Sequence, residues 1–362
     1  MPFLLVFLAS FLLSLVLTPL AGQLGQRLNL ADEPGGRRKH AGRIARTGGI
    51  ALFISFVAGV LITQRLALPL LSTQLGFDVR TDPNEATRIG GLLIGLSIVF
   101  VFGLLDDKFE FRPGLQFVAQ FVASIVAIAS LIIIERFNNP FTNQQVILSD
   151  IAPWLIVPLS LFWLMGMMNT VNWLDGLDGL AAGIAAIFSA VLFVAMVQDT
   201  ATQDPQLSIA PLPLALLGAT LGFLPYNFYP ARVFMGSSGA LTLGFALGCL
   251  GIIGGAKMAT VLLVLAVPII DVAWLIVSRV RHGQSPLQGG RDHLHFRLLD
   301  LGLSQRQIVI GYYLISALFG ALALLIEARI YKVLALGVLG IVTLIVLIIV
   351  AQKSEQVEQT KK

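Results

Sequence analysis

Charged residues and cysteine are both scarce in this sequence of 362 residues. Only 12% of the residues are charged, whereas 56% are hydrophobic and the mean hydropathy is +0.86. A soluble domain of this length could not bury so much apolar surface, so the composition excludes a soluble fold and indicates a membrane protein. The single cysteine, Cys249, excludes a disulfide framework and a CxxC or zinc-binding pattern.

A continuous basic surface is also lacking. The formal net charge is +4 and the pI is near 9.4, but the basic residues stand in short loops between apolar runs, without interleaved aromatic residues. This distribution excludes nucleic acid as a partner and favours the lipid bilayer, anionic headgroups and phosphates.

Apolar windows of about 17 to 23 residues, each long enough to cross a bilayer, recur along the whole chain. Because backbone groups in lipid must be paired within a segment, each window is predicted to be a helix. We therefore predict an all-α, polytopic membrane protein with about eleven transmembrane helices. The windows are 3–21, 48–63, 89–105, 115–134, 151–168, 179–197, 208–224, 238–255, 258–279, 307–326 and 332–351. The shorter apolar stretch 66–71 is expected to lie at the interface.

The positions of the basic residues predict the orientation. Eleven crossings place the termini on opposite sides, and most of the 24 Lys and Arg then fall in the loops of one side. The positive-inside rule makes that side cytoplasmic. The N-terminus is then expected outside and the C-terminus in the cytoplasm. The protein is expected in the inner membrane. Residues 1–351 are expected to form one domain, followed by a polar, frayed tail at 352–362. The expected cytoplasmic loops are 22–47, 106–114, 168–178, 225–237 and 280–306.

Four carboxylates are predicted at the cytoplasmic membrane edge. Asp106 and Asp107 end the third window, and Asp175 and Asp178 precede the sixth. Ionised together in a medium of low dielectric they would repel one another, so a cation is expected among them. Carboxylate oxygens suit Mg²⁺, which proteins usually hold with one or two carboxylates and substrate phosphates. A Mg²⁺–nucleotide site is therefore predicted.

The stretch NTVNWLDGLDGL at 169–180 places Asn169, Asn172, Asp175 and Asp178 at a spacing of three, along one helical stripe. The alternative is that Asp175 only caps the sixth helix and that the asparagines form interhelical hydrogen bonds. The aspartate pair on the same face favours the site.

Two basic clusters supply groups for phosphates. The first inner loop holds Arg37, Arg38, Lys39, His40, Arg43 and Arg46, and the last holds Arg291, His293, His295 and Arg297. The first cluster can equally serve only to keep its loop inside. Histidine is rare in this chain, with four in all, so the second cluster more strongly indicates phosphate or sugar recognition. Asp271, in the ninth window, either faces the cavity or pairs with a neighbour, and pairing is favoured.

These motifs, in their order GLLDDK, NxxNxxDGxDGL, VFMGxSG and HLHxRL, resemble those of the polyprenyl-phosphate N-acetylhexosamine-1-phosphate transferase family. The similarity runs from the first basic loop to Arg297. The ending DHLHFRL resembles the branch that transfers GlcNAc-1-phosphate to undecaprenyl phosphate, whose members have eleven spans.

The resemblance implies transfer of a HexNAc-1-phosphate from a UDP-HexNAc to polyprenyl phosphate, with Mg²⁺, or Mn²⁺ in its place, at the start of cell-envelope polysaccharide synthesis. In the family the first aspartate, here Asp106, is the proposed base. The residues assigned on this basis are Asp106, Asp107 and Asp178 for catalysis; Lys39, His40, Arg46, Asn169, Asp175, Arg291, His293 and His295 for substrate; and Asn172, Asp175 and Ser237 for metal. The sequence neither requires nor excludes a homodimer.

The chain departs from the family pattern at three positions. Ser237 replaces an aspartate that ligates the metal, Gln116 replaces a lysine, and Phe296 replaces a third histidine. The alternatives are a phospho-MurNAc-pentapeptide transferase, or a catalytically impaired protein that binds polyprenyl phosphate. A flippase is disfavoured because the outer loops carry no matching polar cluster.

Overall fold

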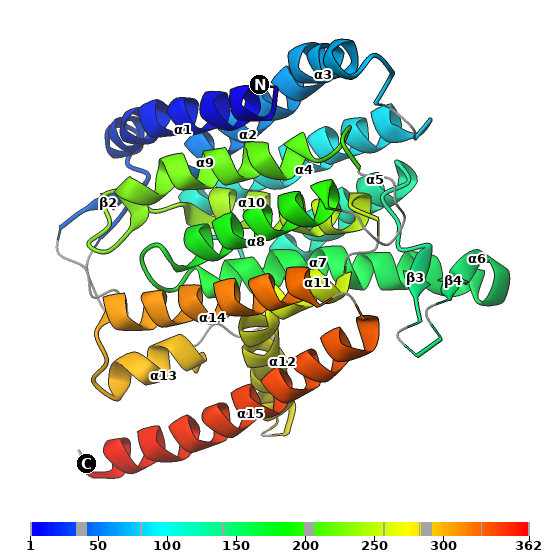
Figure 1. The fold of residues 1–362 in the computed structure, drawn as a ribbon. Coiled ribbons are helices and arrows are strands. Elements are labelled where there is room, and N and C mark those ends of the chain that lie inside the picture. Colours follow the sequence, from blue (N-terminus) through cyan, green and yellow to red (C-terminus); the bar gives the residue numbers. More distant parts are fainter. Residues whose placement is uncertain are drawn as a thin grey trace.

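The structure is a computed structural model that describes residues 2–33, 42–79, 82–139, 141–142, 144–198, 206–255, 258–281, 283, 292–326 and 328–360. This part of the chain is mostly helical (Figure 1). The α-helices are α1 (Pro2–Arg27), α2 (Gly48–Ile62), α3 (Leu68–Leu75), α4 (Glu85–Phe109), α5 (Pro113–Ala129), α6 (Leu148–Ile151), α7 (Ile156–Leu174), α8 (Leu180–Val197), α9 (Pro211–Asn227), α10 (Gly236–Ile253), α11 (Met258–Val264), α12 (Ala266–Arg281), α13 (Leu294–Asp300), α14 (Gln305–Leu325) and α15 (Arg329–Thr360). A π-helical turn η1 (Thr63–Ala67) joins α2 to α3, and a 3-10 turn η2 (Pro153–Leu155) precedes α7. The strands form two antiparallel pairs, β1 (Ala31–Asp32) with β2 (Ile44–Ala45) and β3 (Arg136–Asn138) with β4 (Gln145–Ile147).

Eight helices in the described ranges are long and apolar enough to cross a membrane. They are Pro2–Arg27, Gly48–Leu75, Glu85–Phe109, Pro153–Leu174, Leu180–Val197, Gly236–Ile253, Gln305–Leu325 and Ile330–Lys353. The prediction of a polytopic, helical membrane protein is therefore confirmed. The other three windows correspond to α5 and α9, with 17 residues each, and to α11 and α12, which are separated at Leu265. Eleven crossings stay a prediction, as does the orientation.

Three boundaries differ from the sequence prediction. The second window does not end near residue 63, because the helix continues through η1 to Leu75 and includes the stretch expected at the interface. Pro69 near the start of α3 lacks a backbone N–H, and the wider turn of η1 accommodates it. α7 extends to Leu174, and α15 continues to Thr360 through residues with good helix propensity, so the expected frayed tail is largely helical.

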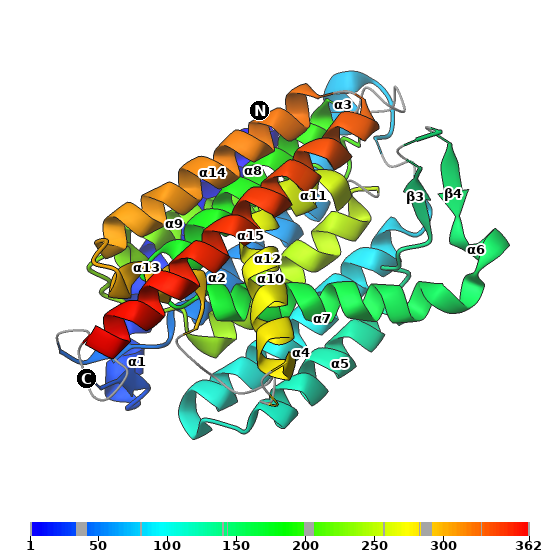
Figure 2. The ribbon, with the colours of Figure 1, turned by 90° about the horizontal axis from the view of Figure 1, so that it is seen from below.

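The central helix is α10, which packs against α4, α7 and α2. Glycines let these helices approach closely: a Cβ on Gly244 would come within 2.5 Å of Met168 Cα. Most helices run side by side, whereas α12 crosses their direction (Figures 1 and 2). The β1–β2 pair and α13 lie at one end of the bundle, and the β3–β4 hairpin lies at the other. We call these the β1–β2 end and the β3–β4 end.

Candidate active site

Asp106 is held at the C-terminal end of α4, where the helix dipole disfavours negative charge. The residue is 5% exposed. Its carboxylate accepts hydrogen bonds from the backbone N–H of Phe111 (3.0 Å) and from Nε2 of Gln116 (2.8 Å). Gln116, which stands where the resemblance led us to expect a lysine, thus contacts the carboxylate through a neutral amide. Both donors fix the direction of the Asp106 carboxylate.

Asp107 binds the N-terminus of α10. Its carboxylate accepts hydrogen bonds from the backbone N–H groups of Ser237 (2.7 Å) and Ser238 (3.1 Å) and from the Ser238 hydroxyl (2.7 Å). This is the favourable end of a helix for an anion. Gly236 has a φ of +68°, and a Cβ there would come within 2.4 Å of the Arg46 carbonyl oxygen and 2.6 Å of Asp107 Oδ1. A glycine is therefore needed for Asp107 to approach α10.

The turn between α7 and α8 carries the second pair of carboxylates. Asp175 follows the last residue of α7, and Gly179, with a φ of +82°, precedes α8. The alternative that Asp175 caps the sixth helix is therefore wrong. Asp178 accepts a hydrogen bond from the backbone N–H of Ala231 (2.9 Å), which ties the turn to the segment before α10.

The electrostatic environment of Asp175 shows that the two aspartate pairs lie at the same end of the bundle. Burial raises the pKa of Asp175 well above its ordinary value, the carboxylates of Asp107 and Asp178 raise this pKa further, and the Arg46 guanidinium lowers it. Groups from three separate segments therefore act on one another electrostatically. Such a crowd of carboxylates favours the binding of a cation.

The two asparagines of the predicted stripe have different positions. Both lie on α7, as their spacing predicts. Asn169, however, donates to the side-chain oxygen of Gln120 (2.7 Å) and to the Met165 carbonyl (2.8 Å). This is the interhelical hydrogen bond considered as the alternative, and it joins Asn169 to α5; its assignment to substrate binding stays a prediction. Asn172, one turn nearer the end of α7, is half-buried.

Arg46 connects the first inner loop with the segment that follows α4. Its guanidinium contacts Asp32 at 2.6 Å and Glu110 at 3.2 Å. Backbone pairing fixes its position, because Ala45 forms a parallel bridge with Val233 in addition to its place in β2. Lys39, His40 and Arg291, which were also predicted to bind substrate, lie outside the described residues.

His293 is oriented by Asp271 of α12. The Asp271 carboxylate accepts hydrogen bonds from the ring Nδ1 of His293 (3.0 Å) and from the backbone N–H of Leu294 (2.9 Å). Asp271 and His293 are 4% and 6% exposed. The favoured interpretation of Asp271 as a paired residue is thereby confirmed. A carboxylate only accepts, so Nδ1 carries the proton and Nε2 is the ring atom left for a ligand.

His295 is 1% exposed, and neither of its ring nitrogens has a hydrogen-bond partner among the described residues. The ring stacks on that of His293, with centroids 5.5 Å apart, and contacts Phe296. A Cβ on Gly176 would come within 2.4 Å of His295 Nε2, so the imidazole lies directly against the turn that carries Asp175 and Asp178. Burial, followed by the charge of His293, lowers the pKa of His295 to about 3. His295 is therefore a neutral hydrogen-bonding group at physiological pH.

Two residues that no sequence pattern singled out also build this site. Asn227, 2% exposed, accepts from the Gly179 N–H (3.2 Å) and donates to the Val233 carbonyl (3.1 Å), so it joins the aspartate turn to the segment before α10. Ser238 supplies two of the three donors to Asp107. Both stand in the polar stretch 225–239, but only a structure shows which of its side chains point inward.

Within the described residues, no three His, Cys, Asp or Glu side chains are grouped closely enough to hold a metal ion by themselves. The donors near the turn nevertheless fit Mg²⁺, which needs few protein ligands when substrate phosphates and water complete its coordination. The carboxylates that raise the pKa of Asp175 supply negative charge that such an ion would neutralise. Asp175 and Asp178, with the hydroxyl of Ser237 and the amide of Asn172, are the residues that would hold it.

Comparison with known proteins identifies the family of this chain. Residues 89–255 match the sequence model of glycosyl transferase family 4. A probable undecaprenyl-phosphate N-acetylglucosaminyl 1-phosphate transferase of Bacillus subtilis is 31% identical over 89% of this chain and 84% of its own length. The chain belongs to glycosyl transferase family 4. The family match contains both aspartate pairs and Ser237, whereas His293 and His295 lie beyond it.

Members of glycosyl transferase family 4 with two kinds of name are similar to this chain. A decaprenyl-phosphate N-acetylglucosaminephosphotransferase of Mycolicibacterium smegmatis is 30% identical over 80% of this chain and 73% of its own length. A phospho-N-acetylmuramoyl-pentapeptide-transferase of Desulforamulus reducens is 33% identical over 87% of this chain and 93% of its own length. Percentage identity alone therefore does not separate the two branches.

Proposed function

We propose that this protein transfers GlcNAc-1-phosphate from UDP-GlcNAc to polyprenyl phosphate, giving polyprenyl-diphospho-GlcNAc and UMP. The observation that carries the proposal is the convergence of both aspartate pairs with Arg46 and His295 at the β1–β2 end. This arrangement suits a reaction between two phosphates at a membrane edge. The relatives that act on undecaprenyl or decaprenyl phosphate support the same substrate class.

In the proposed reaction an oxygen of the lipid phosphate attacks the phosphorus that bears the sugar. A new P–O bond forms, the bond between the two phosphates of the UDP-sugar breaks, and UMP leaves with the electron pair. Asp106 takes the proton of the lipid phosphate, because it is oriented at the membrane edge by Phe111 and Gln116. Asp107 has a positioning role, since its carboxylate accepts three hydrogen bonds at the N-terminus of α10, one more than that of Asp106.

The remaining groups bind the UDP-sugar. Arg46 supplies positive charge, and His293 and His295 supply ring nitrogens beside the aspartate turn. A bound Mg²⁺ would screen the charge of the phosphates. Phosphoryl transfer depends mainly on such positioning and charge neutralisation.

UMP release tests the proposal directly. Purified protein is assayed with undecaprenyl phosphate and a panel of UDP-sugars, with and without a chelator. We expect UMP from UDP-GlcNAc that the chelator abolishes, and loss of that signal in Asp178→Asn but not in Asp150→Asn, which changes an exposed residue near the β3–β4 end. Absence of UMP with every donor would reject the transferase, and a preference for UDP-MurNAc-pentapeptide would assign the chain to the branch of the Desulforamulus relative.

The proposed site faces the cytoplasm of the inner membrane. The only cysteine of the sequence, Cys249, is buried, so introduced cysteines can be labelled selectively. Leu303→Cys, in the turn before α14, should react with an impermeant maleimide only after the cells are opened. Phe141→Cys, 79% exposed beside the β3–β4 hairpin, should react in intact cells. The reverse pattern would invert the orientation.

A further inference from the structure

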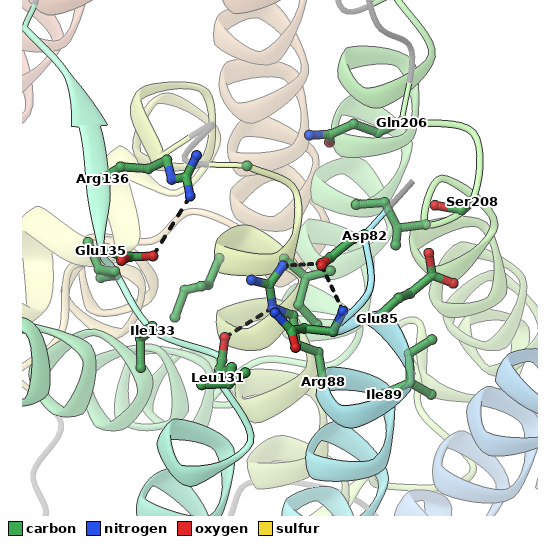
Figure 3. Close-up of a pocket in the computed structure, with 16 residues that line it drawn as sticks. Asp82, Glu85, Arg88, Ile89, Leu131, Ile133, Glu135, Arg136, Gln206 and Ser208 are labelled. Atoms are coloured by element: carbon green, nitrogen blue, oxygen red, sulfur yellow. Dashed lines mark hydrogen bonds and ion pairs between the residues drawn. The ribbon is translucent and has the colours of Figure 1, made fainter. Parts of the chain in front are cut away.

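A second cavity, of about 460 Å³, lies at the β3–β4 end (Figure 3). It is bounded by the start of α4, the segment from the end of α5 into β3, the segment before α9, and the end of α10. α4 has 25 residues, and a helix of that length spans about 37 Å. Because Asp106 and Asp107 stand at the opposite end of α4, this cavity is separate from the candidate active site.

The cavity is lined by both apolar and charged side chains. Isoleucines at 89, 133, 134, 209, 252 and 253 provide the apolar part. The charged side chains are Asp82, Glu85, Arg88, Glu135 and Arg136. A cavity at the end of membrane-spanning helices with both kinds of lining suits a molecule that is itself part polar and part apolar.

The two arginines are not equivalent. Arg88 is fixed, because its guanidinium contacts Asp82 at 2.5 Å and donates to the Leu131 carbonyl at 3.1 Å. Arg136 lies 3.8 Å from Glu135, and their side chains are 57% and 37% exposed. An exposed ion pair at this distance contributes little, so Arg136 can bind an anionic group at small cost.

Acceptor groups stand opposite Arg136. Figure 3 shows Arg136 and Gln206 extending toward each other, with Glu85 and Ser208 on the Gln206 side. The side-chain oxygen of Gln206 is buried and has no hydrogen-bond partner in the described structure, and its amide nitrogen lies against Gly255. Glu85 is 4% exposed. An amide oxygen in need of a donor, in a cavity that is also lined by a carboxylate, suits a group with both positive charge and N–H bonds.

We propose that this cavity binds the headgroup of an aminophospholipid, phosphatidylethanolamine in particular. Its ammonium would donate to Gln206, its phosphate would contact Arg136, and the first part of its acyl chains would cover the isoleucines. The three acidic and two basic side chains of the lining favour a ligand with a cationic group over a purely anionic lipid. The binding does not depend on the proposed transferase reaction.

Lipid binding to the purified full-length protein tests this assignment. Native mass spectrometry and thermal unfolding are measured after titration with phosphatidylethanolamine, with phosphatidylcholine, whose ammonium has no N–H, and with phosphatidylglycerol, which has no cation. We expect phosphatidylethanolamine to bind about tenfold more tightly than either, the difference expected for charge-assisted hydrogen bonds. Gln206→Leu should remove about this advantage, whereas Arg136→Gln should weaken the binding of all three lipids, because each carries a phosphate.

The matched control is Arg65→Gln, which removes an exposed arginine of η1 outside the cavity and should bind like wild type. Gln206→Leu preserves side-chain size, and Arg136 is exposed, so at least one variant is expected to fold. Equal binding of the three lipids would overturn the proposal, as would wild-type binding in both variants. Equal stabilisation by soluble phosphoethanolamine would show a small-molecule site instead of a lipid site.

Discussion

The contact between Asp271 and His293 gives the sharpest test of the candidate active site. Asp271→Asn keeps an oxygen that can accept from the Leu294 N–H, so the start of α13 should stay in place. It replaces the other oxygen, which now accepts from His293 Nδ1 at 3.0 Å, with an NH₂ group. That group can only donate, so the proton of the neutral ring moves to Nε2, which then cannot accept a hydrogen bond from substrate.

The size of the effect follows from the bond that is lost. Leaving a buried donor without its acceptor costs about 1–3 kcal/mol, which corresponds to a decrease of about 5- to 150-fold in kcat/KM if it is fully expressed in the transition state. UMP release across pH 6 to 9 measures this decrease and any change in the pH profile. Thermal unfolding shows whether the variant stays folded. The control is Arg279→Gln. Arg279 stands on α12, as Asp271 does, and its replacement removes an ion pair with Asp292 (3.0 Å). This variant should change kcat/KM much less.

A double-mutant cycle separates orientation of the imidazole from a general structural effect. In a His293→Gln background there is no ring to orient, so Asp271→Asn should cost almost nothing more. Additive losses would refute the reasoning, because they would mean that Asp271 acts without His293. An unchanged rate and pH profile in a folded Asp271→Asn protein would refute it equally.

Three further predictions address the other site residues. Asp106→Asn should abolish UMP release while the melting temperature stays close to wild type, because Phe111 and Gln116 can still bond an amide; near-normal turnover would remove Asp106 as the base. Ser237→Asp should lower the Mg²⁺ concentration for half-maximal activity about tenfold, and an unchanged requirement, with Ser237→Ala as control, would place the ion elsewhere. Folding lowers the pKa of His295 from 6.5 to about 3, so below pH 6.5 the unfolded chain takes up a proton that the folded protein does not. The free energy of unfolding therefore falls as the pH drops from 6.5 toward 3. Between pH 7.5 and 5.0 the melting temperature should drop less for His295→Gln than for wild type, and equal drops would contradict the burial of this ring.

Hydropathy predicted most of the membrane helices, because a crossing must be apolar over a fixed length. It could not place the break between α11 and α12, since both pieces are apolar and nothing in the window marks Leu265. It also ended α7 six residues early, because Asn169 and Asn172 are polar although they are helical. Hydropathy gives a polar residue the same value in a helix packed against neighbouring helices as in a loop.

The residue types of the site were predictable, and their partners were not. The spacing of three predicted one helical stripe from Asn169 to Asp178, but α7 ends at Leu174, so Asp175 and Asp178 lie in a turn. The rarity of histidine pointed to His293 and His295. Sequence could not distinguish Asn169, which pairs with Gln120, from Asn172 three residues later. Nor could it show that neighbouring Asp106 and Asp107 have different tasks, one facing Gln116 and the other capping α10.

The way α10 begins has a consequence for how this chain can change through evolution. Residue 237 bonds Asp107 through its backbone N–H, a group that every amino acid except proline possesses. Replacing its side chain therefore leaves the attachment of the helix intact, and selection on metal affinity can act there without a penalty in folding. The serine at this position is a substitution that the architecture tolerates, so it does not by itself mark the loss of an enzyme.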